Sequence, residues 1–529
     1  MKEKSLVTML VVFTLVCTSV GFSSSYTAYA SDSPTVYVFI DKQIYGATET
    51  SLNQYKDDLL SEGYDVIISN VTGSTSASSM RQTLAGDPDV VGCLLVGHTP
   101  VVWYEVGRLF ATDFYFMDLD GTWLDSDEDG RYDGHVNGTG DVQPEIWCGR
   151  IKGWGPNEAD MVNTYFAKVH KLRTGQLVLP QRALAYIDDD WAASGDQWPK
   201  DVYGPYYDEV TVVIDKETTN ADDYKQRLTE GYEHIDLSCH GNVGEHTFKV
   251  PDPSNPEVSI WDGTVNGSDY INIDPKSFMI NFGTCFAATH TLSDGSDADY
   301  YLAGSWIFSP TYGMIAVGST TVGGMGYLDD FYTPLFGQGK TVGEAFKEWA
   351  VKNGEKITYG HPNYDVSLIG DPTLKKPKVV VHAQDQYGNT LARGDVYVDS
   401  LLYAYSNSTI RIWLGNHTIF INDHWENTTD CYTTHRFTFS NWEDNSTNAH
   451  RNITVQSNLS LSANFTKKYC PADVNGDSKV DIKDIAMVAK LFGVNRGDLD
   501  WDSRADIVCD NKIDIKDVAY ASSKFGEIY

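Results

Sequence analysis

The feature that most constrains the fold is a regular alternation of short apolar runs and helical patterns between residues 34 and 373. The apolar runs include TVYVFI, VVGCLLVG, RALAYI, EHIDLSCHG, SFMINF and GMIAVG, with amphipathic stretches such as SLNQYKDDLLSEG and TVGEAFKEWAVKNG between them. Strands that alternate with helices predict an α/β region with a largely parallel sheet, covered by helices on both faces. Ligands of such sheets bind beyond the carboxyl ends of the strands.

The chain of 529 residues is too long for one hydrophobic core, so several domains are expected. Residues 31–373 form the α/β region, with two sub-domains that meet near residues 150–180. Residues 374–467 contain successive strand patterns separated by turns, which predict an Ig-like β-sandwich. Residues 468–529 contain a duplicated segment, and each copy is an acidic loop followed by an amphipathic helix.

The N-terminus is typical of a secretory signal peptide that covers residues 1–30. Lys2 and Lys4 precede a long apolar run, and AYA ends at Ala30 with small residues at the cleavage positions. The alternative is an uncleaved membrane anchor, and no later stretch is apolar enough to span a bilayer. Ten N-x-S/T sequons, seven of them between Asn407 and Asn464, predict a glycosylated extracellular protein.

Charge and cysteine content narrow the partners further. The net charge of −33 argues against nucleic acid and anionic membranes, and it suits a calcium-binding protein or one that attracts basic substrates. Removal of Cys17 with the signal peptide leaves an odd number of cysteines, so at least one thiol is free or pairs outside the chain. A free thiol in a secreted protein suggests a chemical role for it.

The duplicated C-terminal segment has the spacing of oxygen ligands that Ca²⁺ requires. The expected ligands are Asp473, Asn475, Asp477, Lys479, Asp481 and Asp484 in DVNGDSKVDIKD, and Asp506, Asp510, Asp514 and Asp517 in DIVCDNKIDIKD. Val508 occupies the third position of the second loop, which removes one ligand there. A solvated acidic turn is the alternative, and the duplication argues against it. A disulfide between Cys470 and Cys509 is a further expectation.

A third acidic cluster lies inside the α/β region, in MDLDGTWLDSDEDGRYDGH. Asp125, Asp127, Asp129 and Asp133 have the D-x-D-x-D-G spacing of a calcium loop. The sequence therefore predicts a structural Ca²⁺ in this region, with a plain acidic loop as the alternative.

Two predicted strand ends combine residues suited to nucleophilic catalysis. LSCHG ends in His240 and Gly241, and INFGTC ends in Cys285. A thiol nucleophile needs an imidazole to handle its proton, and it needs N–H donors for the developing oxyanion. Cys93 with His98 is the competing pair, but Cys93 lies among aliphatic residues and His98 reads as a strand cap. The other strand cysteines, Cys148 and Cys239, also read as core residues.

Residues 90–373 resemble gingipain-type cysteine peptidases of the caspase-like fold. The stretches PEIWCGRI, LSCHGN, INFGTCFAA, MIAVGSTTV and VSLIGDPTL carry the resemblance, in the family's order. It implies an endopeptidase acting on proteins or peptides, with Cys285 as nucleophile and His240 as general acid and base. It also implies that the N–H groups of Gly241 and Cys285 form the oxyanion hole.

The same resemblance implies further site residues. An acidic residue orients the histidine, and Asp190 is the best match, with Asp188 and Asp189 as competitors. Asp196 or Asp201 would bind an Arg or Lys side chain of the substrate, and Ser319 and Thr320 would begin a pocket wall that runs to Gly326. The alternative is that this aspartate-rich stretch is a solvated or calcium-binding loop.

The C-terminal repeat resembles a dockerin domain over residues 470–529, with the second loop departing from the family pattern. The resemblance implies docking onto a cohesin of a scaffold or cell-surface protein. The competing function is a non-catalytic, scaffold-associated adhesion protein whose peptidase-like region is inactive. A glycosidase would need a pair of carboxylates in a cleft, and the acidic residues here fit calcium better.

Overall fold

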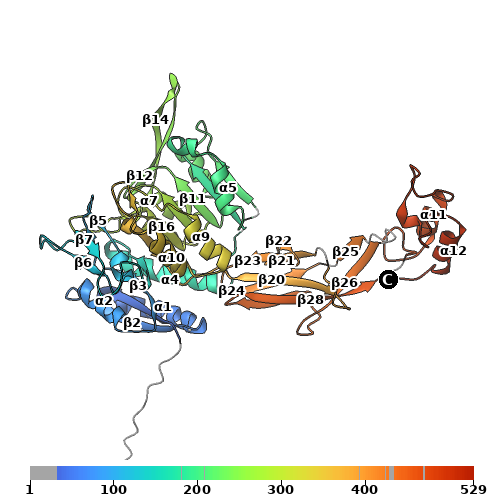
Figure 1. Ribbon diagram of the computed structural model, residues 1–529, viewed down its shortest axis with the longest axis horizontal. Helices are drawn as coiled ribbons and strands as arrows, with labels where there is room; N and C mark the ends of the chain where they lie inside the picture. The colour runs from blue at the N-terminus through green and yellow to red at the C-terminus, as the bar shows by residue number, and fades with distance from the viewer. Residues whose placement is uncertain are drawn as a thin grey trace, which may run out of the picture.

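The computed structural model describes residues 33–528, except for residues 180, 208, 392–393, 423, 428–433 and 469–470. Figure 1 shows three parts in a row: an α/β body, a β-region and a small helical module near the C-terminus. The predicted signal peptide, residues 1–30, lies outside the described residues. Within the described ranges, no helix combines the length and the apolar character that crossing a bilayer requires.

One ten-stranded sheet runs through the α/β body. Its order is β10 (Glu209–Val213), β9 (Arg182–Ile187), β11 (His234–Ser238), β15 (Met279–Gly283), β16 (Ile315–Ser319), β19 (Val366–Gly370), β8 (Trp147–Ile151), β3 (Val90–Val96), β1 (Thr35–Asp41) and β2 (Asp65–Val71). Strands β10 to β16 pair in parallel, as do β8, β3, β1 and β2, whereas β16 and β19 pair antiparallel. The central strands are buried on both faces, which explains their continuous apolar runs.

Helices cover this sheet, as the alternating pattern predicts. They are α1 (Lys42–Ser61), α2 (Ala77–Ala85), α3 (Phe114–Met117), α4 (Glu158–Arg173), α5 (Gln197–Tyr203), α6 (Ala221–Arg227), α7 (Gly267–Ile273), α8 (Leu302–Ile307), α9 (Asp329–Tyr332) and α10 (Val342–Asn353). Helix α10 begins with a capping box, in which Thr341 and Glu344 each bond the other's backbone N–H. The segment between α4 and β9 joins the two halves of the body.

A three-stranded antiparallel sheet stands on the α/β body. It consists of β12 (His240–Asn242), β13 (Glu245–Asp252) and β14 (Asn255–Asn266). Figure 1 shows the β14 hairpin projecting away from the body. Two-stranded sheets are formed by β4 (Trp103–Tyr104) with β5 (Phe110–Ala111), β6 (Thr122–Leu124) with β7 (Gly134–Val136), and β17 (Ile357–Thr358) with β18 (His361–Pro362).

The β-region that follows consists of two sheets around one apolar core. One contains β23 (Thr409–Arg411), β20 (Lys378–Asp385), β28 (Leu459–Lys468), β26 (Thr434–Trp442) and β25 (His424–Asn427); the other contains β22 (Leu401–Tyr405), β21 (Asp395–Val398), β24 (Gly415–Ile421) and β27 (His450–Val455). Residues of both sheets, such as Val381 and Ile419, form the core between them. The region is attached closely to the α/β body, because Trp413 packs into the core of that body. A buried ion pair of Lys376 with Glu233 adds to this junction.

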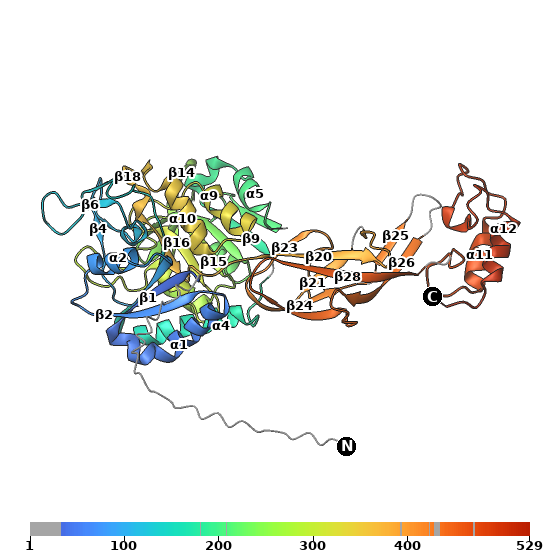
Figure 2. The same cartoon turned by 60° about the horizontal axis from the view of Figure 1, so that its bottom comes forward.

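The described part of the C-terminal module contains the α-helices α11 (Ile482–Lys490) and α12 (Ile515–Ser523), and it has its own small core. Figure 2 shows it at the end of the β-region remote from the α/β body. Cys509 is disulfide-bonded. The other described cysteines have free thiols, so its partner lies outside the described residues, as does the expected partner Cys470.

Candidate active site

Two adjacent parallel strands bring His240 and Cys285 to the same edge of the sheet. Ser238, the last residue of β11, is opposite Gly283, the last residue of β15. His240 and Cys285 therefore each follow this register pair by two residues. They line one cleft of about 530 Å³, and Cys285 is a partly buried free thiol. The arrangement places an imidazole and a thiol at the carboxyl ends of neighbouring strands, where ligands of parallel sheets bind.

The structure separates the three consecutive aspartates that follow β9. The carboxylate of Asp190 accepts a hydrogen bond from Nε2 of His240 at 2.7 Å. Asp188 is fully buried and accepts from the backbone N–H of Lys249, while Asp189 accepts from the hydroxyl of Ser259. Only Asp190 of these three contacts the histidine ring. The bond to Asp190 engages Nε2 of His240 and not Nδ1.

The carboxyl groups of Asp188 and Asp190 have opposite pKa shifts. Burial raises the pKa of Asp188 to about 7, and the nearby Asp189 and Asp190 add to the increase. Partial burial also acts to raise the pKa of Asp190. Hydrogen bonds and charges from Lys249 and His240 outweigh that effect and hold this pKa below its usual value. Asp190 is thus the aspartate that stays ionised beside His240.

Gly241 permits a close approach between the two strand ends. A Cβ atom at this position would lie 2.3 Å from the hydroxyl oxygen of Thr284, the residue before Cys285. It would also lie 3.0 Å from the carbonyl oxygen of Glu245 on the neighbouring strand. The glycine therefore allows the histidine strand to pack directly against the turn that carries the thiol.

The β13–β14 hairpin supplies contacts to His240 that the sequence did not suggest. Lys249 donates from Nζ to Asp190 at 2.6 Å, and its ammonium lies 4.9 Å from the ring centre of Trp261. The rings of Trp261 and Trp191 lie 5.0 and 4.7 Å from the imidazole, both edge-on. The hairpin and the segment after β9 therefore restrict how the imidazole can turn. These contacts join residues far apart in sequence, so no local pattern could reveal them.

Several predicted substrate-binding residues lie outside the cleft lining. Ser319 and Thr320 are buried; Ser319 donates to Asp365, and Thr320 donates to the carbonyl of Ala111. Ser319 is the last residue of the buried strand β16 and Thr320 follows it, so their hydroxyls form hydrogen bonds within the protein interior. The pocket wall begins later, with Gly323, Gly324, Met325, Gly326 and Tyr327, and continues with Thr358, Tyr359 and Asn363.

The two aspartates expected to bind a basic side chain also lie elsewhere. Asp196 is exposed and forms an ion pair with Lys200, one turn along the chain. Asp201 accepts from the side-chain amide of Gln197. Neither carboxylate belongs to the cleft lining, which among the described residues contains no Asp or Glu.

The other described free cysteines, Cys93, Cys148 and Cys239, are buried, as the sequence suggests. Cys239 lies 3.6 Å from Nδ1 of His246, which makes a second cysteine–histidine pair. Burial raises the pKa of Cys239 well above its usual value and lowers the pKa of His246 to about 3. Both groups are therefore neutral, so this pair does not provide a thiolate.

The two C-terminal loops have the same internal hydrogen bonds. The backbone N–H of Asn475 and that of Val508 bond Asp484 and Asp517, and equivalent bonds reach Asp473 and Asp506. In the first loop, carboxylate oxygens of Asp473, Asp477 and Asp484 lie within 4.8 Å of one another. Among the described residues, no such group forms in the second loop, where Asp510 pairs with Lys516.

The other predicted loop residues have local roles as well. Asp481 and Asp514 cap helices α11 and α12, and the backbone of Lys479 bonds Asp477. Carboxylate oxygens therefore converge in the first loop more closely than in the second.

The acidic loop of the α/β body differs from its predicted ligand set. Asp127 and Asp129 gather with Glu105, which lies outside the motif. Asp125 accepts from the backbone of Asp129, and Asp133 accepts from Ser126. The D-x-D-x-D-G spacing therefore identifies two of the three clustered carboxylates here.

Comparison with known proteins identifies a family that matches the α/β body. The family described as "Peptidase family C25" matches residues 33–377. Two solved structures are similar: the Arg-specific cysteine proteinase gingipain R, at 11% identity and TM-score 0.46, over 83% of this chain and 98% of that one; and the complex of the RgpB pro- and mature domains of Porphyromonas gingivalis, at 12% and 0.45, over 73% and 96%. A type II cohesin–X-dockerin complex from Acetivibrio cellulolyticus matches at 18% identity and TM-score 0.16, over 29% of this chain and 97% of that one. None of the curated proteins matches the chain.

Proposed function

The chain belongs to peptidase family C25 and is a cysteine endopeptidase, and from this premise we propose that Cys285 is its nucleophile and His240 its general acid and base. The observation that carries the assignment is the cleft that both residues line. Asp190 supports it by bonding Nε2 of His240, which orients the ring. Cys239 is the other described free cysteine that lines this cleft, but its side chain is buried.

The proposed reaction follows from these positions. His240 takes the thiol proton, and the thiolate of Cys285 attacks the carbonyl carbon of the scissile peptide bond. The N–H groups of Gly241 and Cys285 are the donors proposed for the oxyanion of the tetrahedral intermediate. His240 then protonates the leaving amine, and water hydrolyses the thioester to release the second product and the free thiol.

A thiol-reactive peptidyl inhibitor tests the nucleophile under reducing conditions. We expect the intact chain to be labelled on Cys285 and the Cys285→Ala variant to remain unlabelled. Cys239→Ala is the matched control, because Cys239 is buried and should not react. Equal labelling of the intact chain and Cys285→Ala would refute the assignment and favour the non-catalytic adhesion protein.

We propose cleavage after Arg or Lys as the first candidate specificity, which the family resemblance and the acidic character of the chain support. A second candidate rests on the cleft itself, whose described lining has Met325, Tyr327 and Tyr359 but no carboxylate. That lining favours a large uncharged side chain. Profiling with a peptide library distinguishes the two, since either a basic or an uncharged residue will dominate before the cleaved bond.

We further propose that the protein is secreted and that its C-terminal module binds Ca²⁺ and docks onto a cohesin-type partner. The duplicated loops and the carboxylates that converge in the first one support calcium binding. Removal of Ca²⁺ from the full chain should selectively lower the protection of residues 471–528 against proteolysis. Protection of this module that is insensitive to a chelator would contradict the proposal.

A further inference from the structure

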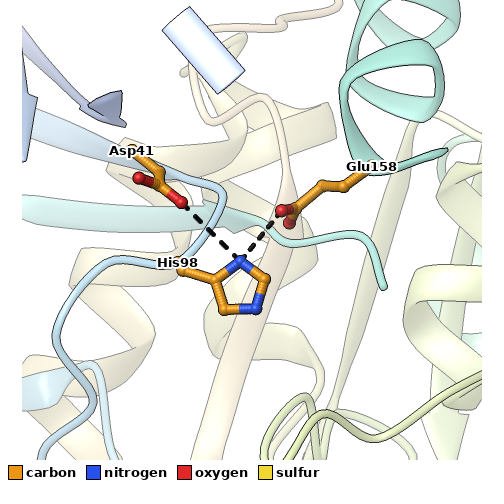
Figure 3. A group of neighbouring side chains, drawn as sticks. All are labelled: Asp41, His98 and Glu158. Atoms are coloured by element: carbon orange, nitrogen blue, oxygen red, sulfur yellow. Dashed lines mark hydrogen bonds and ion pairs between the residues drawn. The ribbon is translucent and has the colours of Figure 1, made fainter. Parts of the chain in front are cut away.

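A second histidine site lies in the other half of the sheet, between two buried carboxylates (Figure 3). Asp41 is the last residue of β1, His98 follows β3 by two residues, and Glu158 begins α4. Nδ1 of His98 lies 2.9 Å from Oε2 of Glu158 and 3.7 Å from Oδ2 of Asp41. Because β1 and β3 are parallel neighbours, their carboxyl ends bring these groups together.

Each carboxylate is fixed through its other oxygen. Oδ1 of Asp41 accepts from the backbone N–H of Gln43 at 2.9 Å. Oε1 of Glu158 accepts from the backbone N–H of Gly153 at 3.0 Å. These bonds leave Oδ2 and Oε2 directed at the same ring nitrogen, as Figure 3 shows. Asp41 and Glu158 are only 5% and 4% exposed, so little solvent offsets their negative charges.

The far side of the ring also has a carboxylate partner. Nε2 of His98 lies 3.0 Å from both oxygens of Asp297, and Lys152 donates to Asp297 at 2.7 Å. A histidine that binds a metal usually donates its other N–H to a carboxylate in this way. Donation from Nε2 to Asp297 leaves the lone pair of Nδ1 facing Asp41 and Glu158. Only a cation between these atoms, either a proton or a metal ion, makes that approach favourable.

We propose that Nδ1 of His98, Oδ2 of Asp41 and Oε2 of Glu158 bind a divalent transition metal of the Zn²⁺ type. Three such atoms within 4.8 Å of one another can surround one ion. Metal–ligand distances of about 2.0–2.1 Å in a tetrahedral site imply ligand separations of about 3.3 Å. The two separations from Nδ1, 2.9 and 3.7 Å, lie on either side of that value.

The donor set distinguishes this site from the acidic loops. One imidazole and two carboxylates suit Zn²⁺, whereas Ca²⁺ needs six to eight oxygens. His98 is partly exposed, so an ion can enter from solvent and a water molecule can complete the coordination. None of the three ligands lines the cleft of Cys285, so the metal is structural and takes no part in peptide-bond cleavage.

The site would stabilise the segment that follows the nucleophile. Asp297 lies between Cys285 and α8, and Lys152 also donates to the carbonyl of His290 and the hydroxyl of Thr291 in the same segment. A metal ion on His98 therefore connects the ends of β1 and β3, through the ring and Asp297, to the segment that leaves the active site.

Calorimetric titration of the full chain with Zn²⁺ tests the proposal. The parent is the Cys285→Ala variant with Ca²⁺ present, so that neither the catalytic thiol nor the acidic loops take up Zn²⁺. We expect one binding event that His98→Gln removes and that Asp297→Asn weakens about 10–100-fold. His170→Gln is the matched control, because within the described ranges His170 pairs with a single carboxylate, that of Asp58, at 3.0 Å.

Thermal unfolding provides a second readout that is independent of peptidase activity. Zn²⁺ should raise the midpoint of the parent and of His170→Gln, and it should leave His98→Gln unchanged. A folded His98→Gln variant that binds Zn²⁺ as tightly as the parent would overturn the proposal. A parent that binds no Zn²⁺ would overturn it too.

Discussion

The two halves of the sheet each place a histidine two residues beyond a buried strand, but only one of them is suited to peptide-bond cleavage. His98 follows β3 and His240 follows β11, and both rings are partly exposed. His98 has a carboxylate at each ring nitrogen, Glu158 at one and Asp297 at the other. Among the described residues, His240 has a single carboxylate partner, Asp190, and shares its cleft with Cys285.

This difference shows what the strand end does and does not determine. The end of a parallel strand places a histidine at an accessible edge, and its neighbours decide the chemistry. The cysteine closest to His98 in the sequence is Cys93, which lies within β3 and is fully buried. Cys285, which lines the same cleft as His240, belongs to the next strand end, beyond the register pair of β15 with β11. A nucleophile therefore requires two adjacent strand ends, whereas a metal site requires converging carboxylates.

Replacing the two histidines should give the largest contrast. We expect His240→Ala to lower kcat/KM for a peptide substrate by about 10³–10⁴-fold, because the thiol loses its proposed general base. His98→Ala should change kcat/KM by less than about tenfold, or about 1.4 kcal/mol, since its ring does not line the cleft. Both values are measured in steady state on variants with unchanged circular dichroism. Equal losses in the two variants would show that the halves do not divide their roles in this way.

The next contrast concerns the aspartates after β9. Asp190→Asn should lower kcat by about 10²-fold or more, because an amide cannot hold the imidazolium as a carboxylate does. Asp189→Asn is the matched control, as Asp189 contacts Ser259 instead of His240. Its kcat should stay within about tenfold of the parent value. If the two variants behave alike, Asp190 does not orient His240.

Substitution of Gly241 tests the close approach of the two strand ends. Gly241→Ala should destabilise the fold by about 1–3 kcal/mol, because the new methyl group overlaps the Thr284 hydroxyl. Thermal unfolding measures the loss. Thr284→Ala in the same chain should restore part of the stability, whereas a purely additive double variant would place the strain elsewhere.

The sequence predicts more of the strand ends than of the surfaces around them. Apolar runs in the sequence predict β11 and β15. His240 and Cys285 follow the ends of these runs, where parallel strands place ligand-binding residues. The pocket wall was predicted to begin at Ser319, but the buried strand β16 extends through that residue. The hairpin residues Trp261 and Lys249 reach His240 and Asp190, respectively, only through tertiary packing, which no local pattern encodes.

The same limit applies to charged groups. Asp196 and Asp201 lie close in sequence to Asp190, but the short helix α5 directs them to Lys200 and Gln197. The carboxylate of Glu105 lies close to those of Asp127 and Asp129, although Glu105 precedes the D-x-D-x-D-G motif in the sequence and is not part of it. Spacing predicts which carboxylates share a loop, and the fold decides which additional ones approach it.

The smallest expected effect is a change in the pH dependence of kcat/KM when Lys249 is replaced. Lys249 holds the pKa of Asp190 below its usual value, so the ionised carboxylate that orients His240 persists to low pH. Removal of this ammonium by Lys249→Gln should raise the pKa of Asp190. Asp190 then gains its proton at a higher pH, and the acidic limb of kcat/KM should shift upward in pH. The Lys249→Arg variant keeps the charge and should keep the parent profile. An unchanged acidic limb in Lys249→Gln would show that Asp190 does not govern it.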